Sequence, residues 1–294
     1  MSDDHSQPFA LNAPAKINLT LDMVGRRADG YHLLRSVMQT VDLCDTVTLM
    51  CGGEGIRLTL SDDTLPADER NTAWKAAALF YEATELPPSV DILIEKRIPQ
   101  QAGLAGGSTD AAAVLRGLNE LYDYPLTDAV LLMLAEKIGA DVPFCLVGGT
   151  CMCEGIGEKL TPLNDLPPVW LVIVKPPVGV STGAAYAAVD SQNLPLHTEQ
   201  EERLLAGLAG GDAAAVAGNL FNVFDEALAL PETGEIKAAM APYAPLGHVM
   251  TGSGSAVFGF FEKEEQALAC AEALETEHEW ETFVCRPTRA FPKN

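Results

Sequence analysis

A glycine-rich segment that runs directly into a helical pattern constrains this chain more than any other feature. The stretch PQQAGLAGGSTDAAAVLRGLNEL (residues 99–121) has three glycines between residues 103 and 107, followed by apolar residues at helical spacing. Glycine has no Cβ, so it adopts positive φ and lets a bound group approach the backbone. We therefore predict a loop that opens a helix over residues 108–121, with Ser108 or Thr109 as its N-cap.

Such a loop favours an anion site. The first amide groups of a helix have no intrahelical partner, and the helix dipole adds a partial positive charge at the same end. A tight turn that only caps a core helix remains an alternative. Three glycines and two hydroxyl residues in one loop make phosphate the favoured ligand.

The better-known phosphate and nucleophile motifs are absent. A P-loop needs Gly-Lys-Ser/Thr, and the chain contains no Gly-Lys dipeptide. The dinucleotide pattern G-x-G-x-x-G fails because Gly252 and Gly254 are followed by Val257 where the third glycine would stand. Ser108 lacks the flanking glycines of a hydrolase nucleophile elbow. The segment therefore predicts a phosphate loop of another type.

Composition narrows the classes of partner. A chain of 294 residues with 48% hydrophobic content can form one large or two ordinary domains, and its formal net charge of -22 argues against nucleic acid or an anionic membrane as main partner. An acidic start and the lack of a long apolar run predict a cytoplasmic protein. Seven scattered cysteines indicate reduced thiols, and Cys151 and Cys153 have no second pair to complete a zinc site.

The alternation of elements predicts an α+β protein of two domains, residues 1–162 and 163–294. The second domain begins with the strand VWLVIV after a proline-rich break. Helices then follow to about Ala241, including one alanine-rich helix at 204–221, and two strand–helix signals end the chain. In the first domain we predict strands within 9–24, 36–50, 56–60 and 90–96, helices at 71–85 and 126–139, and a closing strand pair within 144–155.

Three further stretches carry chemical groups. Lys16 lies in an apolar strand two residues before Asn18, where it would bind an anion or protect a strand edge. Tyr31 and His32 follow a turn and suit a flat heterocycle, although a plain surface turn explains them equally. Asp141 lies between a helix end and a proline, either as a turn residue or as a fixed carboxylate that accepts a hydroxyl proton.

Taken together, these segments resemble a kinase superfamily. PAKIN (14–18), the segment 99–113 and TGSGS (251–255) are similar, in order and spacing, to the three motifs shared by galactokinase, homoserine kinase, mevalonate kinase and phosphomevalonate kinase. The resemblance spans essentially the whole chain. It implies ATP-dependent phosphorylation of an alcohol. It also implies an N-terminal domain like ribosomal protein S5 domain 2 and a ferredoxin-like C-terminal domain.

Within this superfamily, GYH, GLAGGSTDAAA and GADVPF are similar to the branch that phosphorylates the 2-hydroxyl of 4-diphosphocytidyl-2-C-methyl-D-erythritol in the non-mevalonate isoprenoid pathway. The implied partner is this small molecule, with neither nucleic acid nor membrane, in a monomer or homodimer. A kinase for homoserine or mevalonate stays open as an alternative, as does a binding protein that keeps the fold without catalysis. A homoserine or mevalonate kinase would not need Tyr31 and His32.

The resemblance also implies residue roles. Lys16 would neutralise charge and Asp141 would be the catalytic base. Mg²⁺ is expected with ATP, and Ser108 is the one candidate ligand for it. The implied ATP-binding residues are Pro99, Gly103, Leu104, Ala105, Gly106, Gly107, Ser108 and Thr109, with Asn71 and Lys96 on the adenine side. The implied substrate-binding residues are Asn18, Tyr31, His32, Asp141, Tyr186, Gly252 and Ser253.

Two loop positions depart from the family pattern. Ala105 stands where glycine is usual, and Thr109 stands where serine is usual. Thr109 keeps the hydroxyl group. Ala105 is harmless if its φ is negative, whereas a positive φ would cost about 1 kcal/mol.

Overall fold

The computed structural model describes residues 7–289, and the chain forms two compact units from interleaved segments. The first unit comprises the segments up to Ala15, Leu43–Ile98 and Ala105–Val147, and the second comprises Lys16–Asp42, Pro99–Leu104 and the chain from Gly148 onward. The boundary after residue 162 stays a prediction about sequence domains, since neither unit is contiguous in the chain.

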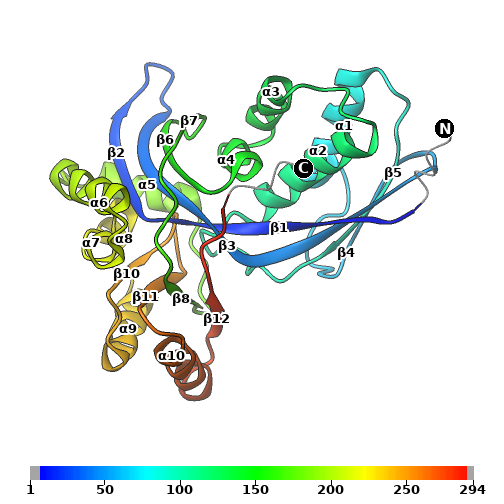
Figure 1. Cartoon of the computed structure of the whole chain (residues 1–294). Helices are drawn as coiled ribbons and strands as arrows, with labels where there is room; N and C mark the ends of the chain where they lie inside the picture. The colour runs from blue at the N-terminus through cyan, green and yellow to red at the C-terminus, as the bar shows by residue number, and fades with distance from the viewer. Residues whose placement is uncertain (1–6, 290–294) are drawn as a thin grey trace. The chain divides into compact units, whose positions relative to one another are not determined.

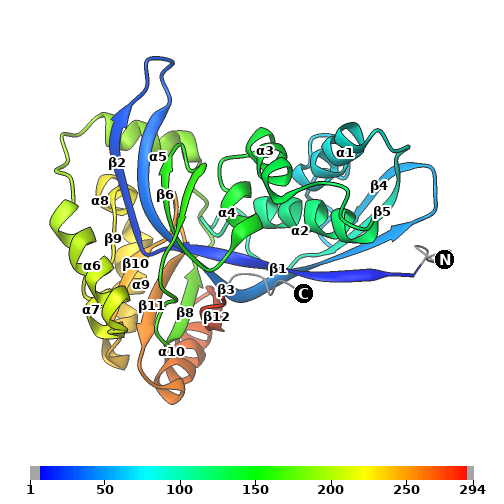
Figure 2. The same cartoon turned by 45° about the horizontal axis from the view of Figure 1, so that its top comes forward.

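The first unit combines strands with four helices, which lie on one side of these strands (Figures 1 and 2). Strand β5 is central, parallel to β4 and antiparallel to β3, with Thr46 opposite Glu95. Strands β1 and β3 also extend into the second unit. The elements are β1 (Phe9–Asn18), β3 (His32–Cys51), β4 (Gly55–Leu60), α1 (Thr72–Thr84), β5 (Ser89–Glu95), α2 (Gly106–Leu121), α3 (Asp128–Ile138) and α4 (Val142–Val147).

Helix α2 packs directly on the strands through a residue without a side chain. A Cβ at Gly117 would lie 2.5 Å from Leu49 Cδ1 and 2.8 Å from Leu11 Cδ1. The run of alanines at 111–113 is buried as well. Small residues therefore bring the helix close to β1 and β3, which fixes the position of its N-terminus.

The second unit holds two groups of strands. Strand β3 pairs with β2 and β6 here, and β6 pairs with β7. The remaining elements are β2 (Thr20–Arg26), β6 (Thr150–Gly155), β7 (Lys159–Pro162), β8 (Trp170–Lys175), α5 (Thr182–Asp190), α6 (Thr198–Gly210), α7 (Ala213–Ala217), β9 (Phe221–Asn222), α8 (Val223–Leu228), α9 (Pro231–Met240), η1 (Ala241–Tyr243), β10 (Gly247–Met250), β11 (Val257–Phe261), α10 (Glu264–Glu277) and β12 (Glu281–Cys285).

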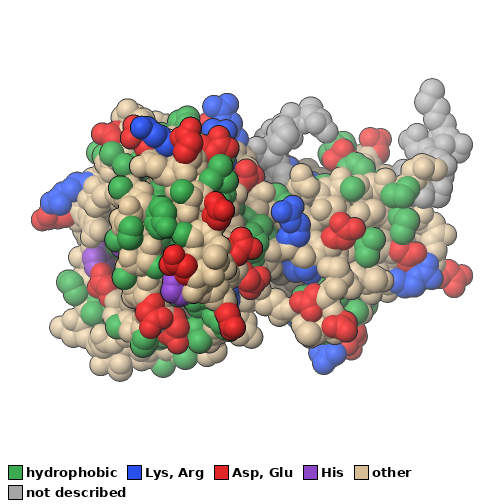
Figure 3. Space-filling view, turned by 90° about the horizontal axis from the view of Figure 1, so that it is seen from below, with side chains coloured by type: hydrophobic (Ala, Val, Ile, Leu, Met, Phe, Trp, Pro, Cys, Tyr) green, Lys and Arg blue, Asp and Glu red, His purple; other side chains and the backbone are tan. Residues whose placement is uncertain are grey.

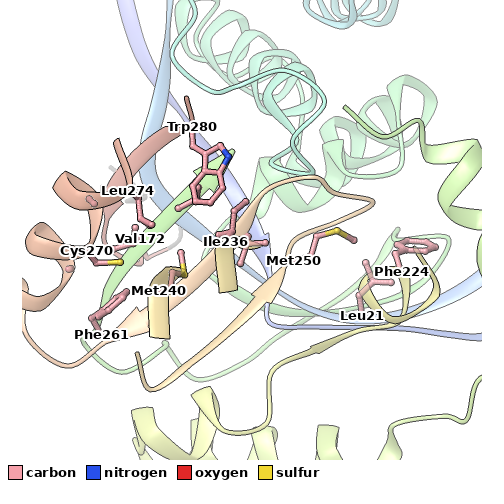
Figure 4. Packing of buried hydrophobic residues seen from close by; sticks show 14 of the residues in the cluster. Leu21, Val172, Phe224, Ile236, Met240, Met250, Phe261, Cys270, Leu274 and Trp280 are labelled. Atoms are coloured by element: carbon pink, nitrogen blue, oxygen red, sulfur yellow. The ribbon is translucent and has the colours of Figure 1, made fainter. Parts of the chain in front are cut away.

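Four of these strands form the predicted ferredoxin-like sheet. The sheet is antiparallel with the order β10-β11-β8-β12, and the chain visits its strands as β8, helices, β10, β11, α10, β12. On one face, alternate residues of β8 and β11 meet α9 and α10 in an apolar core (Figure 4). That core includes Val172, Val174, Val257, Phe261, Ile236, Met240, Cys270 and Leu274.

Most predicted elements are confirmed, and the exceptions have local causes. Residues 144–147 are part of helix α4 rather than a strand, because a short apolar run does not distinguish a buried strand from a buried helix. The strand pair starts later, at β6. The alanine-rich stretch is two helices, because Gly211 ends α6 in the left-handed region at φ 68°. After the β10–β11 hairpin, the residues up to 289 contain one helix and a final strand rather than two strand–helix pairs.

Candidate functional site

Two glycine segments of the second unit are in direct backbone contact. Gly103 has φ +75°, and a Cβ there would lie 2.0 Å from the carbonyl oxygen of Thr251. Gly252 has φ +54°, and a Cβ there would lie 2.8 Å from Gly103 Cα. The segment TGSGS is the turn between β10 and β11, as the hairpin alternative predicted, and it also lies against the glycine loop. Any side chain at Gly103 or Gly252 would separate the two segments.

Asn18 links the two glycine segments to Lys16. The Asn18 side chain is fully buried, and its Oδ1 accepts hydrogen bonds from Lys16 Nζ (2.7 Å) and the Gly252 amide (2.9 Å). Its Nδ2 donates to Ser36 Oγ at 2.8 Å, and the Lys16 amide donates to Leu104 O at 3.1 Å. Asn18 is predicted to contact substrate. Its polar atoms bind protein groups and orient the Lys16 ammonium and the Gly252 amide, so Asn18 also has a positioning role, while its contact with substrate stays a prediction.

A second buried asparagine shapes the same turn and has no signal in the sequence. Asn222 Nδ2 donates to Met250 O at 2.7 Å and to Gly252 O at 2.8 Å. Its Oδ1 accepts from the Phe224 amide at 2.9 Å and caps helix α8. Asn222 lies 30 residues from Gly252 in the chain, so no local pattern links the two.

The hairpin between β2 and β3 presents Tyr31 and His32. Tyr31 follows the turn at Gly30, and 62% of its surface is exposed. The His32 ring stacks on Tyr186 of α5, with ring centroids 4.7 Å apart and 24° between the planes. The structure therefore brings together His32 and the aromatic residue that the family resemblance assigns to the cytosine site.

Asp190, which sequence reasoning missed, fixes the His32 ring. Its Oδ1 lies 2.8 Å from His32 Nε2. When the neutral ring donates from Nε2, its Nδ1 is an acceptor. Tyr186 also meets Phe224 edge-on at 5.0 Å. The arrangement can stack on a flat base and accept a hydrogen bond from an amino group on its edge.

In the first unit, helix α2 starts earlier than predicted and has a different N-cap. The helix begins at Gly106, and its N-cap is Ala105 at φ 60°, without a side-chain cap. Neither Ser108 nor Thr109 is the cap, because both lie within the first turn; the Thr109 hydroxyl donates to Pro14 O at 2.8 Å. The Ser108 and Thr109 amides are the first of the helix to donate to a backbone carbonyl, that of Ala105. The amides of Gly106 and Gly107 come earlier in the helix, so they point out of its N-terminal end.

The positive φ of Ala105 leads to a stability prediction. Left-handed backbone costs alanine about 1 kcal/mol, so we expect Ala105→Gly to raise the free energy of unfolding by up to about 1 kcal/mol. Denaturant titration followed by circular dichroism measures this. Ala78→Gly inside helix α1 is the matched control, and it should lower stability by about 0.5–1 kcal/mol. Equal losses in both variants would contradict the strain at Ala105.

The two residues predicted on the adenine side both bind protein groups. Asn71 caps α1, with Oδ1 accepting from the Ala73 amide at 2.9 Å and Nδ2 donating to Pro66 O at 2.9 Å. Lys96 lies between the carboxylates of Asp45 and Asp110. Burial alone would lower the pKa of Lys96, but the two carboxylates outweigh it and raise that pKa. Contact of Asn71 or Lys96 with adenine stays a prediction.

Asp141 is held at the start of a helix. It follows the end of α3 at Gly139 and directly precedes α4, and its carbonyl oxygen accepts from the Cys145 amide at 3.0 Å. The residue is half-buried. The two helices thus fix the backbone of GADVPF, while the role of the Asp141 carboxylate stays a prediction.

Other observations bear on metal, redox and membrane chemistry. Among residues 7–289, no group of three or more His, Cys, Asp or Glu side chains could hold a metal ion. None of the seven cysteines forms a disulfide, as predicted. Acidic side chains are spread over the face in Figure 3. The described helices are all too short or too polar to cross a bilayer.

Comparison with known proteins gives one consistent family. The model for the N-terminal domain of GHMP kinases matches residues 71–149, and the model for their C-terminal domain matches residues 205–279. A 4-diphosphocytidyl-2-C-methyl-D-erythritol kinase of Caldicellulosiruptor saccharolyticus is 46% identical over 90% of this chain and 92% of its own length. The same kinase of Clostridium tetani is 42% identical over 91% and 96%.

Solved structures agree. A crystal structure of 4-(cytidine 5'-diphospho)-2C-methyl-D-erythritol kinase superposes with a TM-score of 0.80 at 36% identity, covering 95% of this chain and 100% of that one. Homoserine kinase from Cytophaga hutchinsonii has a TM-score of 0.79 at 21% identity, covering 99% of this chain and 96% of that one. The homoserine kinase shares the fold, while the first structure shares sequence as well.

Proposed function

This chain belongs to the 4-diphosphocytidyl-2-C-methyl-D-erythritol kinase family of GHMP kinases, and on that premise we propose how its residues perform the reaction. The activity is ATP-dependent phosphorylation of the 2-hydroxyl of 4-diphosphocytidyl-2-C-methyl-D-erythritol, a small-molecule alcohol, in the non-mevalonate isoprenoid pathway. The observation that carries the proposal is the interlocked pair of glycine segments beside Lys16. We further propose that the enzyme acts in the cytoplasm, as a monomer or homodimer.

The loop from Gly103 to Thr109 binds the phosphates of ATP in this proposal. The open amides of Gly106 and Gly107 and the dipole of α2 stabilise negative charge. Mg²⁺ would neutralise the charge of the phosphates when bound. The Ser108 hydroxyl, in the first turn of α2, is the protein group that we propose as its ligand.

Lys16 neutralises charge that develops on the transferred phosphoryl group. The residue is 3% exposed and its ammonium is oriented by Asn18, so it needs little reorganisation during the reaction. Asn18 in turn links Lys16 to Gly252 in the turn that lies against Gly103. The position of the charge is therefore coupled to the shape of the glycine loop.

Asp141 acts as the general base. A hydroxyl that attacks phosphorus must lose its proton, and a fixed carboxylate is a suitable acceptor. The segment between α3 and α4 fixes the backbone of Asp141. This role does not depend on the cytidine end of the substrate.

The cytidine end binds at Tyr31, His32 and Tyr186. Tyr31 offers an exposed ring, and His32 is oriented by Asp190 with its Nε2 occupied. His32 Nδ1 can then accept from the amino group of cytosine, a group that uracil lacks. Ser253, whose Oγ lies 3.4 Å from Thr182 Oγ1, is exposed enough to contact the substrate.

Tyr31→Ala and His32→Ala test this assignment. Loss of a buried hydrogen bond costs about 1–3 kcal/mol, and stacking about 0.5–1.5 kcal/mol. We therefore expect each variant to lower kcat/KM for the cytidine substrate at least about tenfold, with little change in ATP affinity. Tyr124→Ala, which removes another exposed tyrosine, is the matched control and should be silent.

An acceptor panel separates this proposal from the alternatives. Wild type and both variants are assayed with the cytidine substrate, free methylerythritol, homoserine and mevalonate. Equal use of an acceptor without cytosine would end the cytidine assignment. Failure of every acceptor under conditions where ATP binds would favour a binding protein that lacks catalysis.

A further inference from the structure

A buried cluster of three charged residues lies behind the start of helix α2. It consists of Asp45 on β3, Lys96 just after β5 and Asp110 on α2, and we call it the ion triad. The side chains are 0%, 8% and 4% exposed, respectively. Charged groups this deeply buried are costly unless they are paired, so the contacts of each member decide what the ion triad does.

The ion triad binds the chain at both ends of the segment 97–110, which contains the glycine loop. At its entry, Asp45 Oδ1 accepts from the amides of Arg97 (2.5 Å) and Ile98 (2.9 Å). At its exit, Asp110 Oδ2 accepts from Lys96 Nζ at 2.6 Å, and the same Nζ donates to Asp45 Oδ2. The Lys96 ammonium therefore connects the chain just after β5, through Asp45, with the start of α2, through Asp110.

The ion triad also lies beside the backbone that we assign to phosphate binding. A Cβ on Gly106 would lie 3.4 Å from Lys96 Nζ and 3.3 Å from Ile98 Cγ2. Lys96 thus packs directly beneath the first residue of α2. Asp110, which binds Lys96, lies one helical turn after Gly106 in α2, so loss of this pair would free the start of the helix. A displacement of about 1 Å at a binding group can cost up to about 100-fold in activity.

The charges in the ion triad are unbalanced, which marks it as more than a stabilising pair. Two carboxylates share one ammonium, and Asp110 Oδ1 has no hydrogen-bond partner within the described part of the chain. Burial raises the pKa of Asp110 to about 7; the Asp45 carboxylate acts in the same direction, while Lys96 opposes it. Buried acids of this kind are concentrated near functional sites.

We propose that Lys96 and Asp110 are positioning residues for the triphosphate of ATP, acting through the backbone of Gly106 rather than through contact with the adenine base. This inference rests on the proposed phosphate role of the loop. It predicts that disturbing the ion triad weakens binding of the phosphate chain whatever base is attached to it.

Asp110→Ala, Asp110→Asn and Lys96→Met test the proposal. We expect Asp110→Ala and Lys96→Met to raise KM for ATP about tenfold, with kcat and KM for the acceptor changed less than about threefold. Asp110→Asn keeps an oxygen for Lys96 and should restore KM to within about threefold. Asp91→Ala, which breaks the exposed Arg57–Asp91 pair in the same unit, is the matched control.

Two further measurements separate positioning of the phosphate chain from direct contact with adenine. Calorimetry with a non-hydrolysable ATP analogue and with tripolyphosphate should show equal fold losses; a loss confined to the ATP analogue would mean that Lys96 contacts adenine, and would overturn the proposal. Hydrogen exchange at 97–107 should rise in Asp110→Ala but not in Asp91→Ala.

An unchanged KM for ATP in folded Asp110→Ala would also overturn the positioning proposal. Wild type that binds tripolyphosphate but phosphorylates no acceptor would instead refute the proposed function.

Discussion

Asp141→Asn lowers kcat by about 100-fold or more and leaves ATP affinity nearly unchanged. The expectation follows from the role of general base, whose removal costs about 10²–10⁴ in rate, while binding of ATP uses other groups. Asparagine keeps the size of the side chain, and the segment is ordered through the Asp141 carbonyl, so the fold should persist. Steady-state kinetics and calorimetry on the same preparation measure both quantities.

The control for this variant is Asp63→Asn, which makes the same change at an exposed aspartate between β4 and α1. Its kinetics should equal those of wild type. If Asp141→Asn keeps near-normal turnover, the acceptor hydroxyl loses its proton by another route, and Asp141 has only the turn role that the sequence also allows.

Gly106→Val abolishes measurable ATP binding in a protein that still folds. A Cβ at this position lies 3.3–3.4 Å from Ile98 and Lys96, so these side chains must shift by a few tenths of an ångström, which is less than a backbone clash would demand. The two additional methyl groups of valine would cover the open amides at the start of α2, where the phosphates bind in our proposal. Calorimetry gives the affinity, and circular dichroism shows whether the fold is retained.

Gly234→Val is the matched control, because Gly234 also lies in the first half of a helix and a Cβ there meets nothing within 4 Å. This control should bind ATP as wild type does. Unchanged affinity in Gly106→Val would remove the helix start from the nucleotide site, and with it the basis of the ion-triad proposal.

The sequence predicts most helices and strands and the position of the glycine loop, because these depend on local patterns, while phosphate binding by the loop stays a prediction. Alternation reveals the strands, and three closely spaced glycines reveal the loop. The φ of Ala105 was beyond such reasoning, since alanine normally avoids the left-handed region and the surrounding structure imposes it. The N-cap at Ser108 or Thr109 was wrong for the same reason: the left-handed residue lets α2 begin at Gly106.

The supporting residues could not be predicted, because each acts on a partner far away in the chain. Asp45 lies 51 residues from Lys96, and Asp190 lies 158 residues from His32. A lone aspartate in a strand or at a helix end has many ordinary roles, so only the fold shows which side chain it meets. The residues taken from the family pattern are recognisable in sequence, whereas the groups that orient them are not.

The backbone contact between Gly103 and Gly252 means that the nucleotide loop is not a self-contained module. Thr251 lies 148 residues beyond Gly103, so during synthesis the loop exists long before the turn that supports it has left the ribosome. A fragment that ends before β10 would contain every residue of the loop and none of the surface on which Gly103 rests. For the same reason, chimaeras that exchange the C-terminal halves of two such kinases must transfer a turn that fits the recipient's loop.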